Sequence, residues 1–504
     1  IGETVLVFAR IAEVVVEALR KATRLVSETS NLNSLVNDSD PLWPENRSGP
    51  LILVSTLFPG SWVSVPESVS SEVNAMPYDH YFGDAPVRLA SGEYQTAWLT
   101  SVVPDSEEGK QWRKTVQSQS IPDATPWMVL RQTDVWRIVF HQIKWALAYV
   151  YLFVWKQVAK EWTYNGIPVG HWFKDAYYMA WTRTKGFANI ERCKNACKLL
   201  NPEIVIYRNE FYSTGRKIST AFKGQAKLIG IQHGMISREH TVYKWHPRDI
   251  GEQLFPEGFD HVHHAPVPDY FAAFGEYYAG QLGGYSAERI IPVGGLRHDA
   301  LIERFNLRAK HSERASQQRA LRKSYNLPQD KPVLLLCTGD KESASVWFRM
   351  VVEALQHRST DMFVAVKLHQ YHGGERDVRS VAKEKHFDAY KVYTGDVYSL
   401  MEASHVLVTG TSTTLLEGRL FGLECIAVCS TSEYQTYPFS EAQLATVATN
   451  AKEMKYALEE KQCVGKQSDN FKKRLAYHLK NVKSDATSSL EKAIREKNSP
   501  KANH

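Results

Sequence analysis

The sequence predicts an α/β protein built on two parallel sheets, with a helical elaboration before them. Short apolar runs alternate with helical segments between residues 202 and 301, and the same alternation resumes between 332 and 429. A highly charged stretch, residues 304–331, separates the two series. Strand–helix–strand alternation is the pattern of a parallel sheet with helical crossovers. We therefore expect two αβ halves joined by a charged linker.

The first half is predicted from five segments in chain order. Strands are expected in PEIVIYRNE (202–210) and AKLIGIQHG (226–234), because both are short apolar runs bounded by turn signals. Between them, FYSTGRKISTAFKG (211–224) has helical spacing and ends in glycine. YFAAFGEYY (270–278) and RIIPVGGLRHDAL (289–301) each add a strand and a turn, and the second leads into a helix.

The second half repeats this order after the linker. Strands are expected at 332–339, 362–370, 391–395, 405–410 and 424–429, helices at 343–357 and 397–404, and a loop followed by a helix at 411–422. In open parallel sheets, ligands bind beyond the carboxyl ends of the strands. We therefore look for functional residues where these strands end.

The first 200 residues are less regular. Residues 51–65 predict a strand that ends in a Pro-Gly turn, the Ser, Pro and Asp of 66–125 predict long loops, and 126–200 predict helices. The longest apolar run, Trp145–Trp155, is too short to cross ~30 Å of hydrocarbon as a helix. Its aromatic density leaves two interpretations, a buried helix or a helix that lies in a membrane interface.

These patterns give five segments. They are a partly helical N-terminal elaboration that includes the candidate membrane-proximal stretch 127–160 (1–200), the remainder of an N-terminal Rossmann-like domain (201–305), a charged linker (306–331), a C-terminal Rossmann-like domain (332–460) and a basic helical tail (461–504).

Composition excludes several classes of protein. The 504 residues have 43% hydrophobic and 23% charged side chains, which is a globular balance and excludes wholesale disorder. The formal net charge of +6 is too small to predict nucleic-acid binding. Six cysteines without a CxxC pair predict a reduced, cytoplasmic chain, and the charges within residues 1–26 argue against a secretory signal. Contact with the cytoplasmic face of the inner membrane stays open.

The most informative segment is VLVTGTSTTLLEGRLFGLECIAV (406–428). A strand enters a loop of hydroxyl side chains and glycine, and a helix follows, an arrangement that binds phosphate; the loop comprises Thr409, Gly410, Thr411, Ser412, Thr413 and Thr414. Glu417 lies one turn inside the helix, where a carboxylate can accept hydrogen bonds from a ribose. The alternative is a Ser/Thr N-cap with Glu417 completing a capping box.

Other strand ends carry candidate groups. Lys367 and His369 end the strand of VKLHQ, where a cation and an imidazole can meet a diphosphate. In IGIQHG, Gln232 and His233 occupy the corresponding position of the first half, and Gly234 would let a backbone approach a ligand closely.

Two charged residues complete the set of candidates. Glu210, at the end of the first strand, is a candidate general base for an acceptor hydroxyl, or else an acid near a helix start. Arg297, after a glycine turn, would either reach an anionic ligand or form an interdomain salt bridge.

No metal site is expected. HVHHAP (261–266) has three histidines but no Asp, Glu or Cys at a recognised ligand spacing. The sequence contains no GxxxxGK[ST], no GxGxxG after the first strand and no GxSxG. P-loop chemistry, a dinucleotide oxidoreductase and an α/β-hydrolase are therefore disfavoured.

Residues 202–440 resemble the GT-B glycosyltransferases of bacterial surface and capsular polysaccharide synthesis. The match rests on the order of IQHG, YFAAFGEYY, AERIIPVGGLRHDAL, VKLHQ and TGTSTTLLEGRLFGLECIAV. The resemblance implies two Rossmann-like domains that face each other across a cleft. The last segment is similar to the ribose- and phosphate-binding loop of UDP-N-acetylglucosamine 2-epimerase, whose ribose-binding Glu falls on Glu417. The epimerase's catalytic segment is not recognisable, which disfavours epimerisation.

IQHG, GGLRHDAL and VKLHQ are also similar to motifs of the CDP-glycerol glycerophosphotransferases. That resemblance implies His233 as general base and His369 as a phosphate ligand, although Gln370 replaces the proline of the family's His-Pro motif. Bacterial sialyl- and Kdo-transferases combine a carboxylate base with a His-Pro motif and a Ser/Thr-rich phosphate loop, and Asn209-Glu210 loosely resembles their carboxylate motif.

The hypothesis that results is a metal-independent glycosyltransferase that uses a nucleotide-activated sugar as substrate and needs no cofactor. The second half would bind the donor and the first half a glycan or lipid-linked glycan acceptor. Glu210 or His233 would take the acceptor proton. Lys367, His369 and Arg297 would stabilise the leaving diphosphate. The alternatives are a phosphotransferase that uses a CDP-polyol donor and a non-catalytic scaffold that retains the fold.

Overall fold

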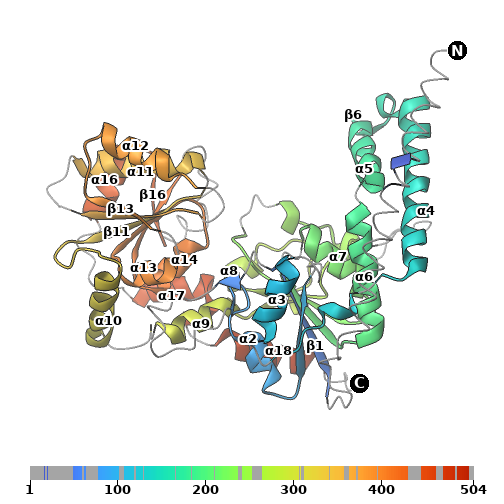
Figure 1. Cartoon of the computed structure of the whole chain (residues 1–504), viewed down its shortest axis with the longest axis horizontal. Coiled ribbons are helices and arrows are strands. Elements are labelled where there is room, and N and C mark those ends of the chain that lie inside the picture. Colours follow the sequence, from blue (N-terminus) through green and yellow to red (C-terminus); the bar gives the residue numbers. More distant parts are fainter. Residues whose placement is uncertain are drawn as a thin grey trace. The chain divides into compact units, whose positions relative to one another are not determined.

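The computed structural model (Figure 1) divides the chain into two compact units, each of which is described by itself. One comprises Ile1–Gly60, Ala90–Ile229 and Pro266–Asp269, and the other Ser61–Leu89, Gly230–Ala265 and Tyr270–His504. The structure describes residues 16–17, 20, 49–58, 62–63, 78–100, 107–117, 121–128, 130–164, 166–182, 184–208, 211–236, 241–252, 264–305, 307, 311–339, 341–356, 362–369, 373–393, 396–429, 444–460, 469–482 and 485–498.

Two six-stranded parallel sheets organise the chain. The first has the strand order β10-β9-β8-β7-β1-β4 and the second β13-β12-β11-β14-β15-β16. The strands of the first are β1 (Leu51–Thr56), β4 (Gln95–Thr100), β7 (Ile204–Arg208), β8 (Lys227–Ile231), β9 (Tyr270–Ala273) and β10 (Ile290–Pro292). Those of the second are β11 (Val333–Cys337), β12 (Phe363–Lys367), β13 (Tyr390–Tyr393), β14 (Val406–Thr409), β15 (Glu424–Val428) and β16 (Thr446–Ala448). The α/β fold with two parallel sheets is therefore confirmed.

The first sheet forms around continuous apolar strands. β1 is LILVST and β7 is IVIYR, and every residue of both is buried, as expected of parallel strands covered on both faces. β1 pairs with β4 on one side and β7 on the other, with Ile52 opposite both Thr96 and Ile204. One face packs on α6 (Thr184–Leu200) and α7 (Ser213–Phe222) through a core that includes Cys197 and Phe222.

The expectation of long loops in residues 66–125 is wrong for much of that segment. Its described residues include α2 (Ala85–Ala90), β4, α3 (Glu107–Gln117) and the short strand β3 (Tyr78–Asp79), which pairs with β2 (Trp62–Val63) just before the segment. β4 is QTAWLT, whose Thr96 and Thr100 are buried beside β1. Their hydroxyl side chains favour a loop in the sequence, but both residues lie inside the sheet because the pairing of β4 with β1 outweighs their local propensity.

Helices dominate residues 126–200, as predicted. α4 (Gln132–Tyr149) continues into a π-helical segment, Val150–Trp155, and returns through the hairpin of β5 (Thr163–Tyr164) and β6 (Ile167–Pro168) to α5 (Gly170–Thr182). Figure 1 shows α4 and α5 side by side. Of the described helices, none is both long enough and apolar enough to span a bilayer.

The second sheet carries helices on both faces (Figure 1). α11 (Lys341–Gln356), α12 (Glu375–Glu384) and α16 (Ala451–Glu460) share one apolar core, to which they contribute Phe348, Val378 and Met454. The remaining helices of this region are α10 (His311–Ser324), α13 (Val397–Glu402) and α14 (Thr414–Leu420). α10 lies in the stretch expected to be a charged linker.

The helices α17 (Asp469–His478) and α18 (Ala486–Asn498) pack on α8 (Glu276–Ala279) and α9 (Leu296–Arg304), which follow the last two strands of the first sheet. α9 follows β10 through Gly294 and Gly295. The C-terminal α17 contacts α8, and α18 contacts α9. The tail is therefore helical, as expected, but Leu490 and Ile494 of α18 are buried, so it is not a solvated face throughout.

Candidate functional site

The predicted donor-binding residues meet at the carboxyl edge of the second sheet. Cys337, the last residue of β11, lies opposite Lys367, the last residue of β12. On the other side of β11, Leu336 lies opposite Val408, so Thr409 reaches the level of Cys337. Three adjacent strands therefore end at one level, and the loops that leave them start side by side. The register brings together Lys367, His369 and the loop 409–414.

Lys367 and His369 occupy one rim of this edge. Lys367 is half-buried, and its Nζ donates to the Leu368 carbonyl at 2.7 Å. Burial lowers the pKa of Lys367, and Cys337 and Asp396 partly offset that effect. The backbone N–H of His369 donates to Thr338 Oγ1 at 3.2 Å, while its side chain is exposed. A desolvated amine next to an exposed imidazole is suited to an anionic ligand.

The hydroxyl loop is shaped by Gly410 and Trp347. A Cβ at Gly410 would overlap the Trp347 ring of α11, so only glycine fits beneath this indole. Ser412 Oγ is 2.8 Å from Thr414 Oγ1 and accepts the backbone N–H of Thr414 at 3.2 Å. Among the described residues Thr411 Oγ1 is buried and has no hydrogen-bond partner.

The capping-box alternative is not observed. Thr413 is the N-cap residue of α14, and its side chain makes no cap hydrogen bond. α14 has seven residues, so its dipole is short and the hydroxyl groups carry more of the loop's polarity than the helix does. Glu417 does not turn back toward the N-cap but pairs with Arg297.

Glu417 and Arg297 form a buried ion pair. Glu417 Oε1 lies 2.8 Å from Arg297 Nη2, and each side chain is 4% exposed. Burial by itself raises the pKa of Glu417, but the charge of Arg297 and a contact with His298 outweigh it and lower the pKa to about 2. Burial lowers the pKa of His298, whose Nε2 lies 3.8 Å from Glu417 Oε1. At neutral pH the pair is therefore an ionised carboxylate held by a guanidinium.

An aromatic and histidine cluster surrounds the guanidinium. Arg297 Nη1 lies 3.3 Å from His80 Nε2, and His80 Nδ1 lies 3.2 Å from the Tyr398 hydroxyl. The guanidinium carbon is 5.6 Å from the centroid of the Tyr81 ring, and that ring meets His233 edge-on at 6.2 Å. His233, Arg297 and Glu417, predicted separately, therefore belong to one connected cluster.

Other predicted residues have structural partners. Gln232 is 3% exposed; its Oε1 accepts the Phe274 N–H at 2.8 Å and its Nε2 donates to the Gly234 carbonyl at 2.7 Å, which fixes the backbone around His233. None of the described residues has an atom within 4 Å of a Cβ built on Gly234, so they leave open space beside that loop.

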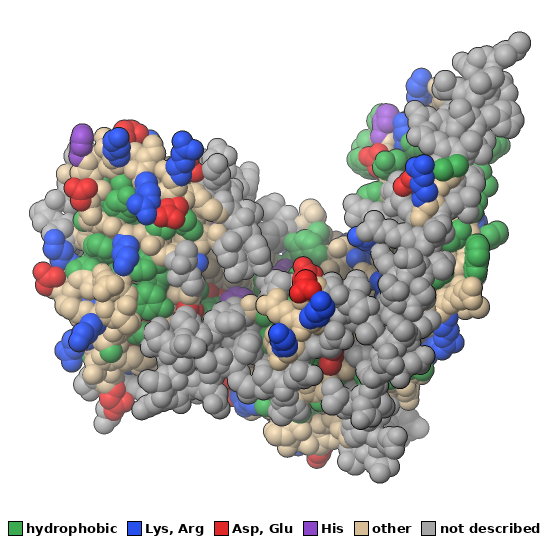
Figure 2. All heavy atoms as spheres, viewed as in Figure 1, with side chains coloured by type: hydrophobic (Ala, Val, Ile, Leu, Met, Phe, Trp, Pro, Cys, Tyr) green, Lys and Arg blue, Asp and Glu red, His purple; other side chains and the backbone are tan. Residues whose placement is uncertain are grey.

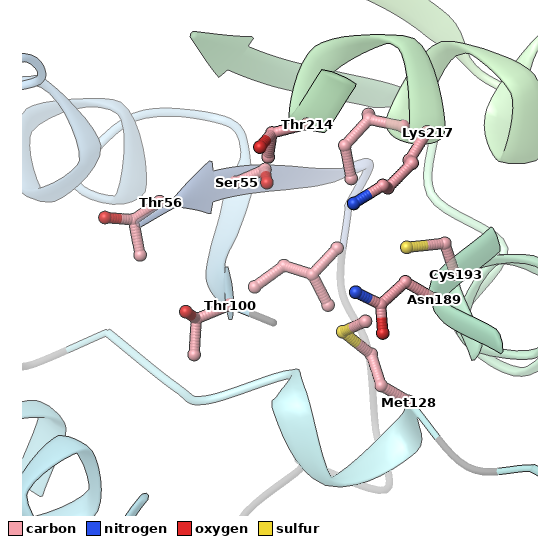
Figure 3. A pocket seen from close by; sticks show the side chains of 10 residues that line it. Ser55, Thr56, Thr100, Met128, Asn189, Cys193, Thr214 and Lys217 are labelled. Carbon is pink, nitrogen blue, oxygen red and sulfur yellow. The ribbon is translucent and has the colours of Figure 1, made fainter. Parts of the chain in front are cut away.

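The other compact unit has a pocket at the carboxyl end of β1 (Figure 3). Its empty volume is about 400 Å³, open solvent included, and its lining is Ser55, Thr56, Leu99, Thr100, Met128, Asn189, Cys193, Thr214, Lys217 and Ile218. Figure 3 shows the amine of Lys217 and the amide of Asn189 pointing inward from α7 and α6. The pocket is polar, with one cation and several hydroxyl groups. Cys193 lines the pocket as an unreactive thiol, because burial raises its pKa to about 12.

Some candidates lie outside the described residues. They are Glu210, the proposed carboxylate base, and His261 and His263 of HVHHAP. Within the ranges that the structure describes, no group of three or more His, Cys, Asp or Glu side chains is placed to hold a metal ion.

Sequence reasoning missed His80, Tyr81 and Tyr398. The first two lie in YDHYFGD, inside a stretch read as loop. Asp79 is fully buried, and its Oδ1 accepts the Tyr81 N–H at 2.7 Å, which turns the chain so that both aromatic rings face the cluster. The sequence signal that could have found them is an Asp, which favours a turn, followed directly by His, Tyr and Phe.

Comparisons with solved structures identify the fold. The UDP-GlcNAc 2-epimerase from Neisseria meningitidis bound to UDP-GlcNAc superposes with a TM-score of 0.53 at 11% identity, covering 88% of this chain and 100% of that chain. This chain has a GT-B-like fold. A glycosyltransferase from Rickettsia africae gives 0.49 at 12% identity (90% and 100% covered), and the S. aureus MnaA–UDP structure 0.48 at 14% (89% and 96%). No family model and no curated protein matches the chain.

Proposed function

We propose that this protein is a metal-independent glycosyltransferase that moves a sugar from a nucleotide-activated donor to a glycan or lipid-linked glycan in surface polysaccharide synthesis. The observation that carries the proposal is the common level at which β11, β12 and β14 end, with Lys367, His369 and the hydroxyl loop on adjacent strands. The Neisseria structure with this fold was solved with UDP-GlcNAc, a nucleotide sugar.

The donor diphosphate would lie along this edge. Lys367 supplies a cation that is already partly desolvated, and the exposed imidazole of His369 adds a second donor. Thr411 Oγ1, which has no partner among the described residues, would donate to a phosphate oxygen. Glu417 is the proposed ribose ligand; because Arg297 holds it, ribose binding would share that carboxylate with the guanidinium or displace it.

The acceptor would bind at the first sheet. The pocket with Lys217, Ser55 and Thr214 is polar and suits the hydroxyl or anionic groups of a glycan or its lipid phosphate. In the reaction, the acceptor oxygen bonds to the anomeric carbon, the bond from that carbon to the diphosphate breaks, and the nucleoside diphosphate leaves. The acceptor proton passes to Glu210, or to His233 if Glu210 is not the base.

A nucleotide panel tests donor binding. UDP, CMP, CDP and GDP are added in turn, and the free energy of unfolding is measured; a ligand at 100 times its Kd adds about 2.7 kcal/mol. Lys367→Gln should abolish the gain. Lys391→Gln, on the exposed side of β13, should retain it. If no nucleotide stabilises the protein, the scaffold alternative replaces the enzyme.

Product analysis with the stabilising nucleotide's donor then separates the chemistries. A glycoside and a free nucleoside diphosphate support the proposal. A phosphodiester identifies the phosphotransferase alternative. Conversion of UDP-GlcNAc to its 2-epimer without an acceptor would make the protein an epimerase, as the structural neighbour from Neisseria is named. If Glu210→Ala keeps the full transfer rate, His233 becomes the favoured base.

A further inference from the structure

The helical hairpin of α4 and α5 displays an apolar surface that the proposed chemistry does not use. Large hydrophobic side chains with 43–74% exposure gather there; they are Trp136, Phe140, Leu147, Tyr151, Ile167, Trp172, Phe173, Tyr178 and Met179. Figure 2 shows hydrophobic side chains on this hairpin, with Lys and Arg among them. Large apolar side chains gathered on one exposed helix face mark an interaction site rather than an ordinary protein exterior.

On α4 the exposed apolar residues form one stripe. Trp136, Phe140 and Leu147 are separated by four and seven residues, which places them within roughly 40° of one another around the helix. Tyr151 continues the stripe in the π-helical segment, so its length is roughly 22 Å. The opposite face of α4 is also apolar and buried, through residues such as Val135 and Ile138.

The base of the hairpin is fixed to the rest of its unit. Asp134 accepts a hydrogen bond from Asn195 of α6 at 2.8 Å, and both side chains are buried. Arg137 pairs with Glu191 of α6 at 3.1 Å. The stripe therefore keeps its outward direction because the buried face of α4 is held by α6. Because one apolar face of α4 is already buried against its own unit, the other apolar face needs a separate apolar partner to cover it.

The charged residues near the stripe indicate whether a second copy of the chain or a membrane covers it. Lys144, which is exposed, borders the stripe, roughly 40° around the helix from Phe140, and the only acid of α4 is the buried Asp134. Between residues 131 and 182 there are six Lys or Arg and three Asp or Glu. Lysine is depleted in interfaces between protein chains relative to the rest of the surface, which disfavours a second copy as the occupant. At a bilayer, the lysine stem lies along the acyl chains while its amine reaches anionic headgroups.

We propose that the outer face of α4, formed by Trp136, Phe140, Leu147 and Tyr151, docks on the interfacial region of a membrane that contains anionic lipid. Tryptophan and tyrosine prefer this region because their rings are apolar and their polar atoms stay wet. Docking requires no helix to cross the bilayer, and it gains from both the buried apolar area and the lysine charges. The inference does not depend on the donor chemistry.

Vesicle co-sedimentation of the full chain tests the proposal. Vesicles of phosphatidylcholine with phosphatidylglycerol should bind the protein, and pure phosphatidylcholine should bind it more weakly. The double variant Trp136→Ser/Phe140→Ser should lose at least about tenfold in affinity. Lys144→Glu should weaken binding only to the anionic vesicles. Tyr456→Ser, which removes an equally exposed aromatic on α16, is the matched control and should bind as the parent does.

Three results would overturn the proposal. The parent protein fails to sediment with either vesicle; the double variant binds as well as the parent; or light scattering shows a dimer that Phe140→Ser dissociates, which would make a second copy the occupant. Circular dichroism and nucleotide-induced stabilisation of each variant, both expected to equal those of the parent, separate lost docking from lost folding and from failure of the proposed enzyme function.

Discussion

The ion pair of Arg297 and Glu417 should contribute strongly to the stability of its unit. Lowering the pKa of Glu417 from 4.5 to about 2 corresponds to about 3 kcal/mol of stability from that carboxylate at neutral pH. Glu417→Gln keeps the shape but leaves the buried guanidinium without its counter-charge, so we expect a loss of about 3–5 kcal/mol. Urea denaturation followed by circular dichroism measures it.

The pH dependence gives a second readout of the same pair. The pKa of Glu417 is lowered in the folded state, so its contribution is fully present above the unfolded value near 4.5 and is lost as pH falls toward 2. The stability difference between the parent and Glu417→Gln should therefore be constant from pH 7 to 5 and shrink below pH 4.5. Glu384→Gln, in the exposed pair with Arg349, should change the urea midpoint little at any pH.

A double-mutant cycle shows whether the two residues act as a pair. Arg297→Met should also destabilise the protein, and the double variant should lose clearly less than the sum of the two single losses. Strict additivity, or a Glu417→Gln loss below about 1 kcal/mol, would refute the description of this pair as a buried, coupled interaction. Either result would also free Glu417 for a purely ligand-binding role.

Three further changes have definite expected results. Gly410→Ala should push the Trp347 ring and weaken nucleotide affinity, measured by the stabilisation that the nucleotide gives, at least about tenfold. Gly186→Ala, whose Cβ would meet Lys217 Cε at 3.9 Å, should leave that affinity unchanged, and equal effects would contradict the role of this loop. Lys217→Ala should raise the KM for an anionic acceptor with little change in kcat, and no rise would remove the pocket from acceptor binding. His80→Phe should destabilise by about 1–3 kcal/mol, because it removes a partner of both Arg297 and Tyr398; a neutral result in urea denaturation would argue that the cluster is not coupled.

The carboxyl edge of the second sheet could be predicted because strand ends are readable in the sequence. Each apolar run ends at a polar residue, and neighbouring parallel strands end at the same edge of their sheet. Lys367 and Thr409 are therefore expected to lie near each other, as the register of the strands shows. The alternation between 202 and 429 has the same origin, since buried parallel strands are continuous apolar runs.

The rest depended on tertiary contacts. Which way Glu417 faces on α14 cannot be read from the loop before it, because its partner Arg297 lies far away in the sequence. Thr96 and Thr100 belong to a strand only because β1 lies beside them. The sequence left two interpretations of the apolar run 145–155, a buried helix or an interfacial one. Only the structure shows which face of α4 is covered and which is exposed.

The C-terminal helices determine when α9 can reach its final state. Asp299 accepts the backbone N–H groups of Ala486 and Thr487 at 3.1 and 2.8 Å, and Asn481 Oδ1 accepts the Gly295 N–H at 2.6 Å. These partners follow Gly295 and Asp299 by 186–188 residues in the sequence. The turn that carries Arg297 therefore stays without them until that later segment has been synthesised, and a nascent chain that lacks the segment would present an unfinished, protease-sensitive turn at this point.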